Sequence, residues 1–541
     1  MRLSRRTRLA GVALLAAVGL TLTACGGGGS DDDTASTDAV ITVDGSEPQN
    51  PLVPSMTNET GGGNVIDMIF AGLVTYEADG SSTLEVAESI ESDDNKTWTV
   101  TLKDWSFSDG TPVTASSFVD AWNQGALSTN AHLNSYFYYP IQGFEEVQAE
   151  NPKVDTMSGL EVVDDKTFTI TLNQPESDFP ARLGYSAFYP LPEAAFEDLQ
   201  AYGENPVGNG PYMMDGEGAW QHDVQIALVP NEDYDGARQA QNAGLTFKFY
   251  TNLDAAYVDV QSGNLDVLKT VPDAYLTTFQ DDNQVQPFSE PGSVFQSFTF
   301  AASMPGFGDD EEGHLRREAI SMAIDRAEIT EKIFADTRTP AVDFSSPLMP
   351  GFTEEIEGNE VVEFNPDEAK KLWAEADAIK PYNGTFQLAY NGDGGHEAWV
   401  EAVTNQISNN LGIKAEGKAY PTFDELRTDV TDRTIDIAFR TGWQPDYPSI
   451  FNYLAPLYGT GAGSNDGDYS NAEFDDLMSQ ASAAESDEER EQIYADAQAI
   501  LMEDLPAIPL WYSNIAAVAA DGVNDVEFNW QNLPEYQLLT K

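Results

Sequence analysis

The chain has 541 residues, more than one hydrophobic core normally serves, so two or three domains are expected. Its hydrophobic content of 41% and its aromatic content of 11% are those of a folded protein and exclude a disordered one. Lys and Arg number 27 against 90 Asp and Glu, so the formal net charge is −63. This charge disfavours nucleic acid and anionic lipid surfaces as partners and attracts cationic ligands, although an acidic surface equally serves solubility.

Residues 1–24 have the pattern of a secretory signal peptide. Four arginines precede an apolar run, Leu9–Leu20, which is too short to span a bilayer because about 20 residues are needed. Residues 22–25 resemble a bacterial lipobox, whose cysteine becomes the lipidated first residue of the mature chain. Cys25 is the only cysteine, so no internal disulfide can form, and we expect a lipid anchor there and a flexible tether over residues 25–38. The alternative is an ordinary signal peptide with an incidental cysteine.

Two similar strands are expected in the first third of the chain. In Thr97–Leu102 and again in Thr167–Leu172, apolar side chains alternate with polar ones, which is the period of a half-buried strand. A turn follows the first strand, and Thr114 is expected to be the N-cap of a helix. That helix carries three large apolar side chains, Phe118, Val119 and Trp122.

Strands and helices alternate later in the chain. A strand is expected over residues 385–390, and the following helix repeats an apolar residue every four positions until Gly412, where a C′ glycine belongs. A second strand, a second helix and a third strand are expected over residues 413–419, 422–430 and 434–440. This alternation predicts a parallel sheet with right-handed crossovers, whose ligands lie beyond the carboxyl ends of the strands.

The third strand leads into a polar and aromatic segment, residues 440–449. Arg440 is expected to be the last strand residue, and Gly442 and Pro445 are expected to end the pairing. The side chains left on the loop are then Trp443, Asp446 and Tyr447. An aromatic wall beside one acid and one base suits a polar or zwitterionic ligand. A structural salt bridge between the arginine and the aspartate, with the tryptophan packed as loop core, explains the segment equally well.

Several segments in chain order resemble landmarks of one protein family. They are residues 97–123, 207–214, 263–268, 315–329, 468–478 and 505–512. With them, the mature sequence resembles the large extracytoplasmic solute-binding proteins of ABC importers, in the oligopeptide- and dipeptide-binding family.

The resemblance implies an α/β fold of the large, class II periplasmic-binding-protein type. Two lobes joined by a hinge close over the ligand, and a peripheral α+β domain lies near the N-terminus. Lobe 1 is expected to comprise residues 39–72, 206–300 and 509–541, the peripheral domain residues 73–205, and lobe 2 residues 301–508.

The resemblance also implies a ligand site. Residues 442–447 match a Gly-Trp-x-x-Asp-Tyr motif in which the aspartate, here Asp446, holds the α-ammonium of a peptide. Arg440 occupies the position of an arginine that meets the ligand carboxylate in some relatives, and the backbone of Gly442–Gln444 would pair with the ligand like an added strand. Ser449 stands where relatives often have a second acid. The expected ligand-binding residues are Arg440, Gly442, Trp443, Gln444, Asp446 and Tyr447, with a second backbone strip at Asn58, Glu59 and Thr60.

The function implied is binding and not catalysis. We expect a monomeric, lipid-anchored receptor on the extracytoplasmic face of the cell membrane that captures oligopeptides and delivers them to permease subunits, without cofactor or metal. A receptor for oligosaccharides is the first alternative, because Trp443 and the aromatic residues 136–139 could stack on sugar rings. A secreted hydrolase is less favoured, since the four histidines form no zinc motif and no Gly-x-Ser-x-Gly elbow occurs. Residues 464–471 suggest Ca²⁺ but lack EF-hand spacing.

Overall fold

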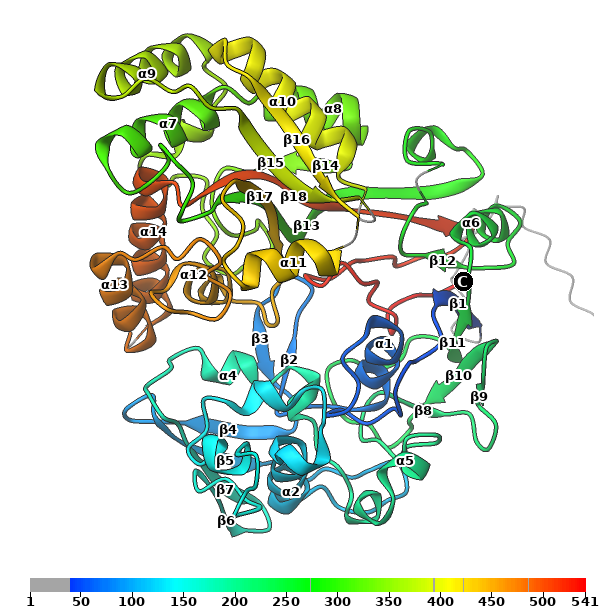
Figure 1. The fold of residues 1–541 in the computed structure, drawn as a ribbon. Helices are drawn as coiled ribbons and strands as arrows, with labels where there is room; N and C mark the ends of the chain where they lie inside the picture. The colour runs from blue at the N-terminus through cyan, green and yellow to red at the C-terminus, as the bar shows by residue number, and fades with distance from the viewer. Residues whose placement is uncertain (1–38, 273, 393–394, 422, 485) are drawn as a thin grey trace, which may run out of the picture. The chain divides into compact units, whose positions relative to one another are not determined.

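A computed structural model of the protein describes residues 39–541, apart from residues 273, 393–394, 422 and 485 (Figure 1). The expected signal peptide, the lipidation site at Cys25 and the tether over residues 25–38 therefore lie outside the described residues. None of the helices that the structure describes has both the length and the apolar character that crossing a bilayer requires.

One large mixed sheet runs through the described residues. Its strands lie in the order β16-β15-β17-β13-β18-β12-β1-β11-β10-β8, with β14 beside β18 and β9 beside β10. The strands are β1 (Val40–Gly45), β8 (Tyr212–Met214), β9 (Trp220–Gln221), β10 (Gln225–Pro230), β11 (Gly244–Phe249), β12 (Val267–Leu268), β13 (Val285–Phe300), β14 (Arg338–Pro340), β15 (Phe386–Asn391), β16 (Ala415–Tyr420), β17 (Ala438–Trp443) and β18 (Ala507–Ala520).

Two long antiparallel strands, β13 and β18, carry this sheet from one half of the protein to the other. Near one end β18 pairs with β12, where Val267 faces Ala519, and at the other end β13 pairs with β17. The register between β13 and β18 shifts between Pro291 and Phe295, so the ladder is interrupted near its middle.

Two smaller antiparallel sheets lie in the first half of the chain. One comprises β4 (Ala87–Glu91), β5 (Thr97–Leu102), β7 (Thr167–Thr171) and β6 (Leu160–Asp164) in that order, and the other comprises β2 (Val74–Tyr76) and β3 (Ser82–Leu84). Helices of this half are α1 (Thr60–Ile69), α2 (Ala115–Ala126), α3 (Phe144–Val147), α4 (Phe179–Arg182), α5 (Leu199–Tyr202) and α6 (Leu253–Gln261).

The second half of the chain is richer in helix. Its helices are α7 (Glu311–Met322), α8 (Arg326–Phe334), α9 (Pro366–Ile379), α10 (Glu397–Leu411), α11 (Phe423–Thr431), α12 (Ile450–Tyr458), α13 (Ala472–Ser482) and α14 (Asp487–Asp504). In Figure 1 the helices α7, α9 and α10 gather beside strands β15–β17.

The buried apolar side chains form two separate clusters. One draws on residues 41–285 and 518–539, and the other on residues 295–512 together with Trp530. The two-lobed α/β fold expected from the sequence is confirmed. The expected boundaries between the lobes and the peripheral domain stay predictions.

The two strands expected from alternation are confirmed, and the structure pairs them with each other. Strands β5 and β7 are antiparallel neighbours, with Thr97 facing Thr171. Thr114 is the N-cap of α2, and its backbone N–H donates to Ser117 Oγ at 3.1 Å. Helix α2 covers β7, because the rings of Phe118 and Phe168 stack with their centroids 5.9 Å apart.

The parallel unit of the second lobe is confirmed, with one shift. Strand β15 is parallel to β16 on one side and to β17 on the other, and α10 ends at Leu411 before Gly412, whose φ is 73°. The third strand, expected over residues 434–440, lies instead at Ala438–Trp443.

Candidate functional site

Strand β17 is paired unequally on its two sides. It is bonded to β13 along its whole length, whereas β15 pairs with it only at Ala438 and Phe439 among the described residues. From Arg440 to Trp443 the backbone therefore presents one edge that β15 does not cover. Such an edge can accept an extended partner chain through main-chain hydrogen bonds.

The prediction that Arg440 ends this strand, with Gly442 breaking the ladder, is wrong. Gly442 pairs with Gln296 of β13 and Trp443 pairs with Phe295, so the neighbouring strand extends β17 by three residues. Trp443 is consequently a strand residue and not a loop residue. Its indole N–H donates to Asn452 Oδ1 at 3.0 Å.

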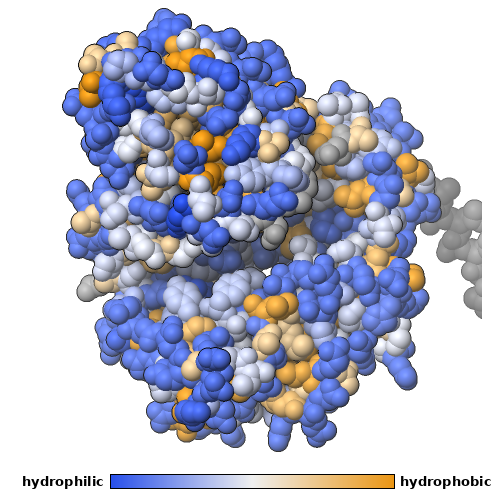
Figure 2. Space-filling view, in the orientation of Figure 1, coloured by the Kyte–Doolittle hydropathy of each residue, from blue (hydrophilic) through white to orange (hydrophobic). Residues whose placement is uncertain are grey.

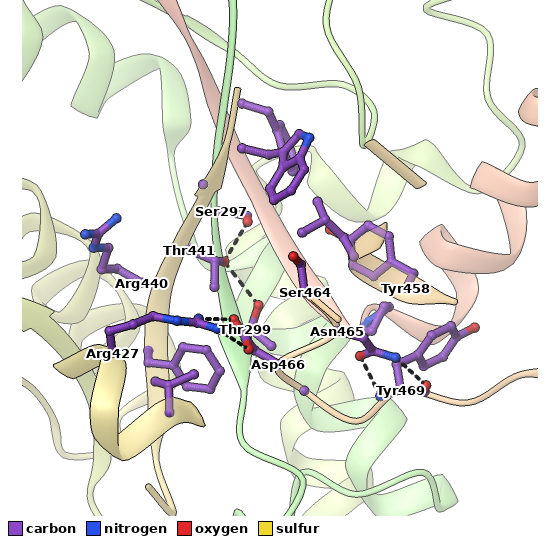
Figure 3. Close-up of a pocket in the computed structure, with 18 of the residues that line it drawn as sticks. Ser297, Thr299, Arg427, Arg440, Thr441, Tyr458, Ser464, Asn465, Asp466 and Tyr469 are labelled. Carbon is purple, nitrogen blue, oxygen red and sulfur yellow. Dashed lines mark hydrogen bonds and ion pairs between the residues drawn. The ribbon is translucent and has the colours of Figure 1, made fainter. Parts of the chain in front are cut away.

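A cavity of about 330 Å³ lies beside β17, and we call it the β17 pocket (Figure 3). Its hydroxyl groups bond to one another: Thr441 Oγ1 lies 2.8 Å from Ser297 Oγ and 3.1 Å from Thr299 Oγ1. Asp466 is paired with Arg427, whose Nη2 donates to Asp466 Oδ1 at 3.0 Å. These hydroxyl groups and the carboxylate of Asp466 thus have partners within the protein.

Arg440 also lines the β17 pocket, but Figure 3 shows its side chain pointing away from Asp466. Its Nε donates to Asn391 Oδ1 at 2.8 Å, and its guanidinium lies 4.8 Å from the centre of the Phe423 ring. The salt bridge between Arg440 and Asp446 that the sequence left open is absent from the ion pairs of the described residues.

A second cavity, of about 410 Å³, lies between the two groups of elements that were expected to bind the ligand, and we call it the cleft. Asn58, Glu59 and Thr60 line it from the first lobe, and Gln444 and Asp446 line it from the second. Figure 2 shows a hollow in the largely hydrophilic surface between the elements of the two core clusters. The other lining residues include six aromatic ones, which are Tyr76, Tyr136, Tyr185, Tyr189, Trp530 and Tyr536.

Asp446 is held in place without a cationic partner. Asn452 Nδ2 donates to its Oδ2 at 3.1 Å, and Asn452 Oδ1 accepts the backbone N–H of Asp446 at 2.9 Å. No ion pair of the described residues includes this carboxylate. Burial raises the pKa of Asp446, and the bond from Asn452 and the charge of Arg182 oppose that rise only in part.

The backbone strip expected in the first lobe is shorter than predicted. Glu59 is the N-cap of α1, and its carboxylate accepts the backbone N–H of Gly62 at 2.8 Å and that of Gln49 at 3.0 Å. The extended backbone ends at Glu59, because Thr60 is the first residue of the helix. Thr60 therefore cannot pair with a ligand in the manner of a strand.

Tyr447 lines neither cavity. Its side chain is 1% exposed, and its ring lies 4.8 Å from the guanidinium of Arg182, which forms a buried ion pair with Glu176 at 2.6 Å. Nearby, Ser449 Oγ donates to Asp178 Oδ2 at 2.8 Å. Ser449, which stands where relatives often have an acid, is thus itself bonded to an acid, the N-cap residue of α4.

Several residues that line the cleft were not expected from the sequence. They are Asp67, Tyr76, Tyr185, Tyr189, Arg238 and Trp530. One signal was present: Asp67 interrupts the apolar run of α1, where Ile66 and Met68 on either side of it are buried.

Metal binding finds no support in the geometry. Within the part of the chain that the structure describes, no group of three or more His, Cys, Asp or Glu side chains is placed to hold an ion. In the acidic loop over residues 464–471, Asp466 pairs with Arg427, and Asp468 pairs with Arg433 at 2.9 Å.

The sequence matches that of known binding proteins over nearly its whole length. The family described as bacterial extracellular solute-binding proteins, family 5 Middle, matches residues 83–465. The oligopeptide-binding protein OppA of Bacillus subtilis is 26% identical, over 96% of this chain and 98% of its own. The periplasmic oligopeptide-binding protein OppA of Salmonella typhimurium is 28% identical, over 88% of each chain.

Solved structures share the fold. The unliganded open form of MppA, a periplasmic murein tripeptide binding protein, superposes with a TM-score of 0.82 at 24% identity, covering 94% of this chain and 98% of that one. Haemophilus influenzae OppA, in complex with RPPGFSPFR, has a TM-score of 0.67 at 23% identity, with 94% and 99% covered.

The family match decides between a binding protein and an enzyme. The hydrolase considered from the sequence is set aside, because the family is one of solute-binding proteins and the match extends over most of the chain. The chain belongs to the bacterial extracellular solute-binding proteins of family 5.

Proposed function

We propose that this chain is the receptor of an ABC importer and captures oligopeptides in the cleft. It would stand as a monomer on the extracytoplasmic face of the membrane, anchored by lipid on Cys25, and deliver its ligand to permease subunits. The names of its relatives support peptides as the ligand class, since both OppA proteins are described as oligopeptide-binding.

The observation that carries this proposal is the uncovered edge of β17, Arg440–Trp443, which leads to Asp446. An extended peptide laid along Arg440–Trp443 adds a strand to the sheet, and main-chain bonds of this kind do not depend on the peptide's side chains. The strand leads through Gln444 and Pro445 to a carboxylate in the cleft that has no cationic partner. The α-ammonium of the peptide supplies that partner.

The contact at Asp446 also accounts for selectivity. A hydrogen bond between charged groups contributes about 1.5–3 kcal/mol. A ligand without a free amine leaves the carboxylate buried and unpaired, which is unfavourable by a similar amount.

Arg440 and the β17 pocket would receive the later part of the ligand. Arg440 lies at the far end of the same edge, six residues before Asp446, and we assign it to the carboxylate of a short peptide. Gly442, Trp443 and Gln444 contribute backbone between these two ends, and the β17 pocket, whose Asp466 is already paired with Arg427, takes an uncharged side chain.

Ligand binding would close the lobes over the cleft. The first lobe is assigned residues 39–72, 206–300 and 509–541, the second 301–508, and the peripheral domain 73–205. Strands β13 and β18 run between the two core clusters, and the shift in their register near Gly292 suits a hinge. A ligand that contacts both lobes shifts the equilibrium toward the closed form, which the permease recognises.

A receptor for oligosaccharides is the second candidate, because aromatic rings such as Tyr136 and Trp530 line the cleft. A thermal-shift screen of tripeptides against oligosaccharides separates the two. We expect tripeptides with a free amine to raise the melting temperature and their N-acetylated forms to have little effect. Stabilisation by oligosaccharides alone, or equal stabilisation by acetylated peptides, would overturn the proposal.

A further inference from the structure

A further carboxylate, that of Asp67, faces the cleft from the lobe opposite Asp446. Asp67 lies in the last turns of α1 and lines the same cavity as Asp446. Among the described residues its carboxylate accepts one side-chain hydrogen bond, a long one, from Tyr189 Oη to Oδ1 at 3.3 Å. A carboxylate has room for about four hydrogen bonds, so most of the acceptor capacity of Asp67 is unused within the protein.

The nearest cation does not neutralise Asp67. The guanidinium of Arg238 pairs with Glu85 at 3.2 Å, and its other N–H groups donate to the backbone carbonyls of Asp67 and Phe70 at 2.6 and 3.0 Å. Glu85 is 3% exposed and lies behind the cleft lining. No ion pair of the described residues includes the carboxylate of Asp67.

The two carboxylates share a set of aromatic neighbours. The pKa of Tyr185 is raised by burial first, and then by the charges of Tyr136, Asp446 and Asp67. The pKa of Tyr76 is likewise raised by burial first, and both Asp67 and Asp446 add to that rise. Asp67 and Asp446 therefore act on the same two rings, which line the cleft between them.

We infer that Asp67 binds the cationic side chain of a lysine or arginine at one of the first two positions of the bound peptide, while Asp446 holds the α-ammonium. This inference rests on the proposed function. Four acidic residues line this cavity of about 410 Å³, and two of them, Glu59 and Glu535, accept hydrogen bonds within the protein from Gly62 and Gln49 and from Gln537. Asp67 and Asp446 then suit two positive groups on one ligand, as a basic residue near a free amino terminus supplies. Tyrosine faces beside the carboxylates also favour a cation.

The negative net charge of the whole protein also favours a peptide with two positive groups. With 90 acidic and 27 basic residues, its field attracts a peptide with two positive groups more strongly than a peptide with one. The cleft adds a specific position to this general attraction. The preference should therefore depend on Asp67 itself and not on net charge.

Calorimetric titration with matched peptides tests this. The peptides are Lys-Ala-Ala and Ala-Lys-Ala, each with a counterpart in which norleucine replaces lysine and removes the charge at nearly constant shape. For at least one position we expect the wild type to bind the lysine peptide about tenfold more tightly than its counterpart. In Asp67→Asn the ratio should fall to near one, while affinity for the norleucine peptide stays within about threefold of wild type.

A control variant tests whether the loss of lysine preference in Asp67→Asn comes only from the loss of one negative charge. Asp120→Asn changes the net charge equally, but Asp120 is exposed on α2, outside the cleft. It should keep the wild-type lysine preference. A thermal melt confirms that Asp67→Asn is folded, and retained binding of the norleucine peptide shows the same.

The possible failures are distinguishable. If no peptide binds the wild type, the proposed function falls and the role of Asp67 falls with it. If peptides bind but lysine gives no advantage, or Asp67→Asn weakens lysine and norleucine peptides equally, only the role of Asp67 is overturned. If Asp120→Asn loses the preference as well, the effect is one of net charge and the inference fails.

Discussion

The β17 pocket and the cleft differ in whether the carboxylates that line them are paired with a cation. In the β17 pocket, Asp466 is paired with Arg427 and the hydroxyl groups of Ser297, Thr299 and Thr441 bond to one another. In the cleft, Asp446 and Asp67 face the cavity with no cationic partner among the described residues. A pocket whose carboxylate is already paired selects for shape, whereas unpaired carboxylates select for a charged ligand.

Removing the carboxylate of Asp446 should have the largest effect. In Asp446→Ala we expect peptide affinity to fall by at least about 100-fold, or about 3 kcal/mol, because the ligand ammonium is left desolvated without its partner. Isothermal titration calorimetry measures the loss. Asp436→Ala, which removes an exposed acid just before β17, should bind as the wild type does. Equal affinity in the wild type and Asp446→Ala would place the ammonium elsewhere.

Acidification should weaken binding through the same carboxylates. The pKa of Asp446 in the free protein lies above its usual value, and a bound ammonium lowers it. Affinity is therefore complete above the free-protein pKa and falls as the pH drops through it, and in that window binding releases a proton. Titrations in buffers of different ionisation enthalpy detect this proton. Affinity that is independent of pH would contradict a carboxylate at the ligand ammonium.

The preference for lysine should have its own pH dependence. Burial raises the pKa of Asp67 to about 6, against the opposing charge of Arg238 and the bond from Tyr189. The other titratable groups around it are Tyr76, Tyr185 and Tyr536, together with Glu85, which is paired with Arg238, and Asp446, which acts on the same rings. We expect the ratio of lysine to norleucine affinity to shrink below about pH 6 in the wild type and to stay flat in Asp67→Asn.

Breaking the paired charge of the β17 pocket should reduce stability more than affinity. Asp466→Asn weakens the contact with Arg427 and should lower the free energy of unfolding by about 1 kcal/mol. Affinity for an alanine tripeptide should change by less than about threefold, since the ligand ammonium does not reach this pocket. Urea unfolding and calorimetry on the same variant separate the two quantities. A loss of affinity as large as that of Asp446→Ala would show that the two cavities do not differ as argued.

Sequence patterns correctly predict those helices and strands whose ends depend on residues nearby in the sequence. The alternation in Thr97–Leu102 and the glycine at position 412 carry their own signals, and both elements appear where expected. The end of β17 is different, because residues 441–443 remain in the sheet only through β13, a strand far away in the sequence. Period-2 alternation contains no information about such a partner.

The cleft was predicted in part for the same reason. The segment that ends at Asp446 was found through its likeness to a motif, and the structure brings it to Asn58 and Glu59. Tyr447 was assigned to the ligand, but its surroundings are decided by Arg182 from another part of the chain. Asp67 was not predicted. An acid within an apolar helix indicates that its position is unusual, but the sequence does not indicate which cavity the side chain lines.

The buried environment of Asp67 also affects the stability of the protein without ligand, and this is the smallest effect that we expect. The pKa of Asp67 is about 6 in the folded protein and near 3.8 in the unfolded chain, so its ionised form destabilises the folded state at neutral pH. Asp67→Asn should therefore raise the free energy of unfolding above pH 6, and this gain should vanish below about pH 4. Urea unfolding at several pH values measures it. If the variant is less stable than the wild type at neutral pH, the carboxylate of Asp67 stabilises the fold. If the variant is more stable, the carboxylate lowers stability and its role is in ligand binding.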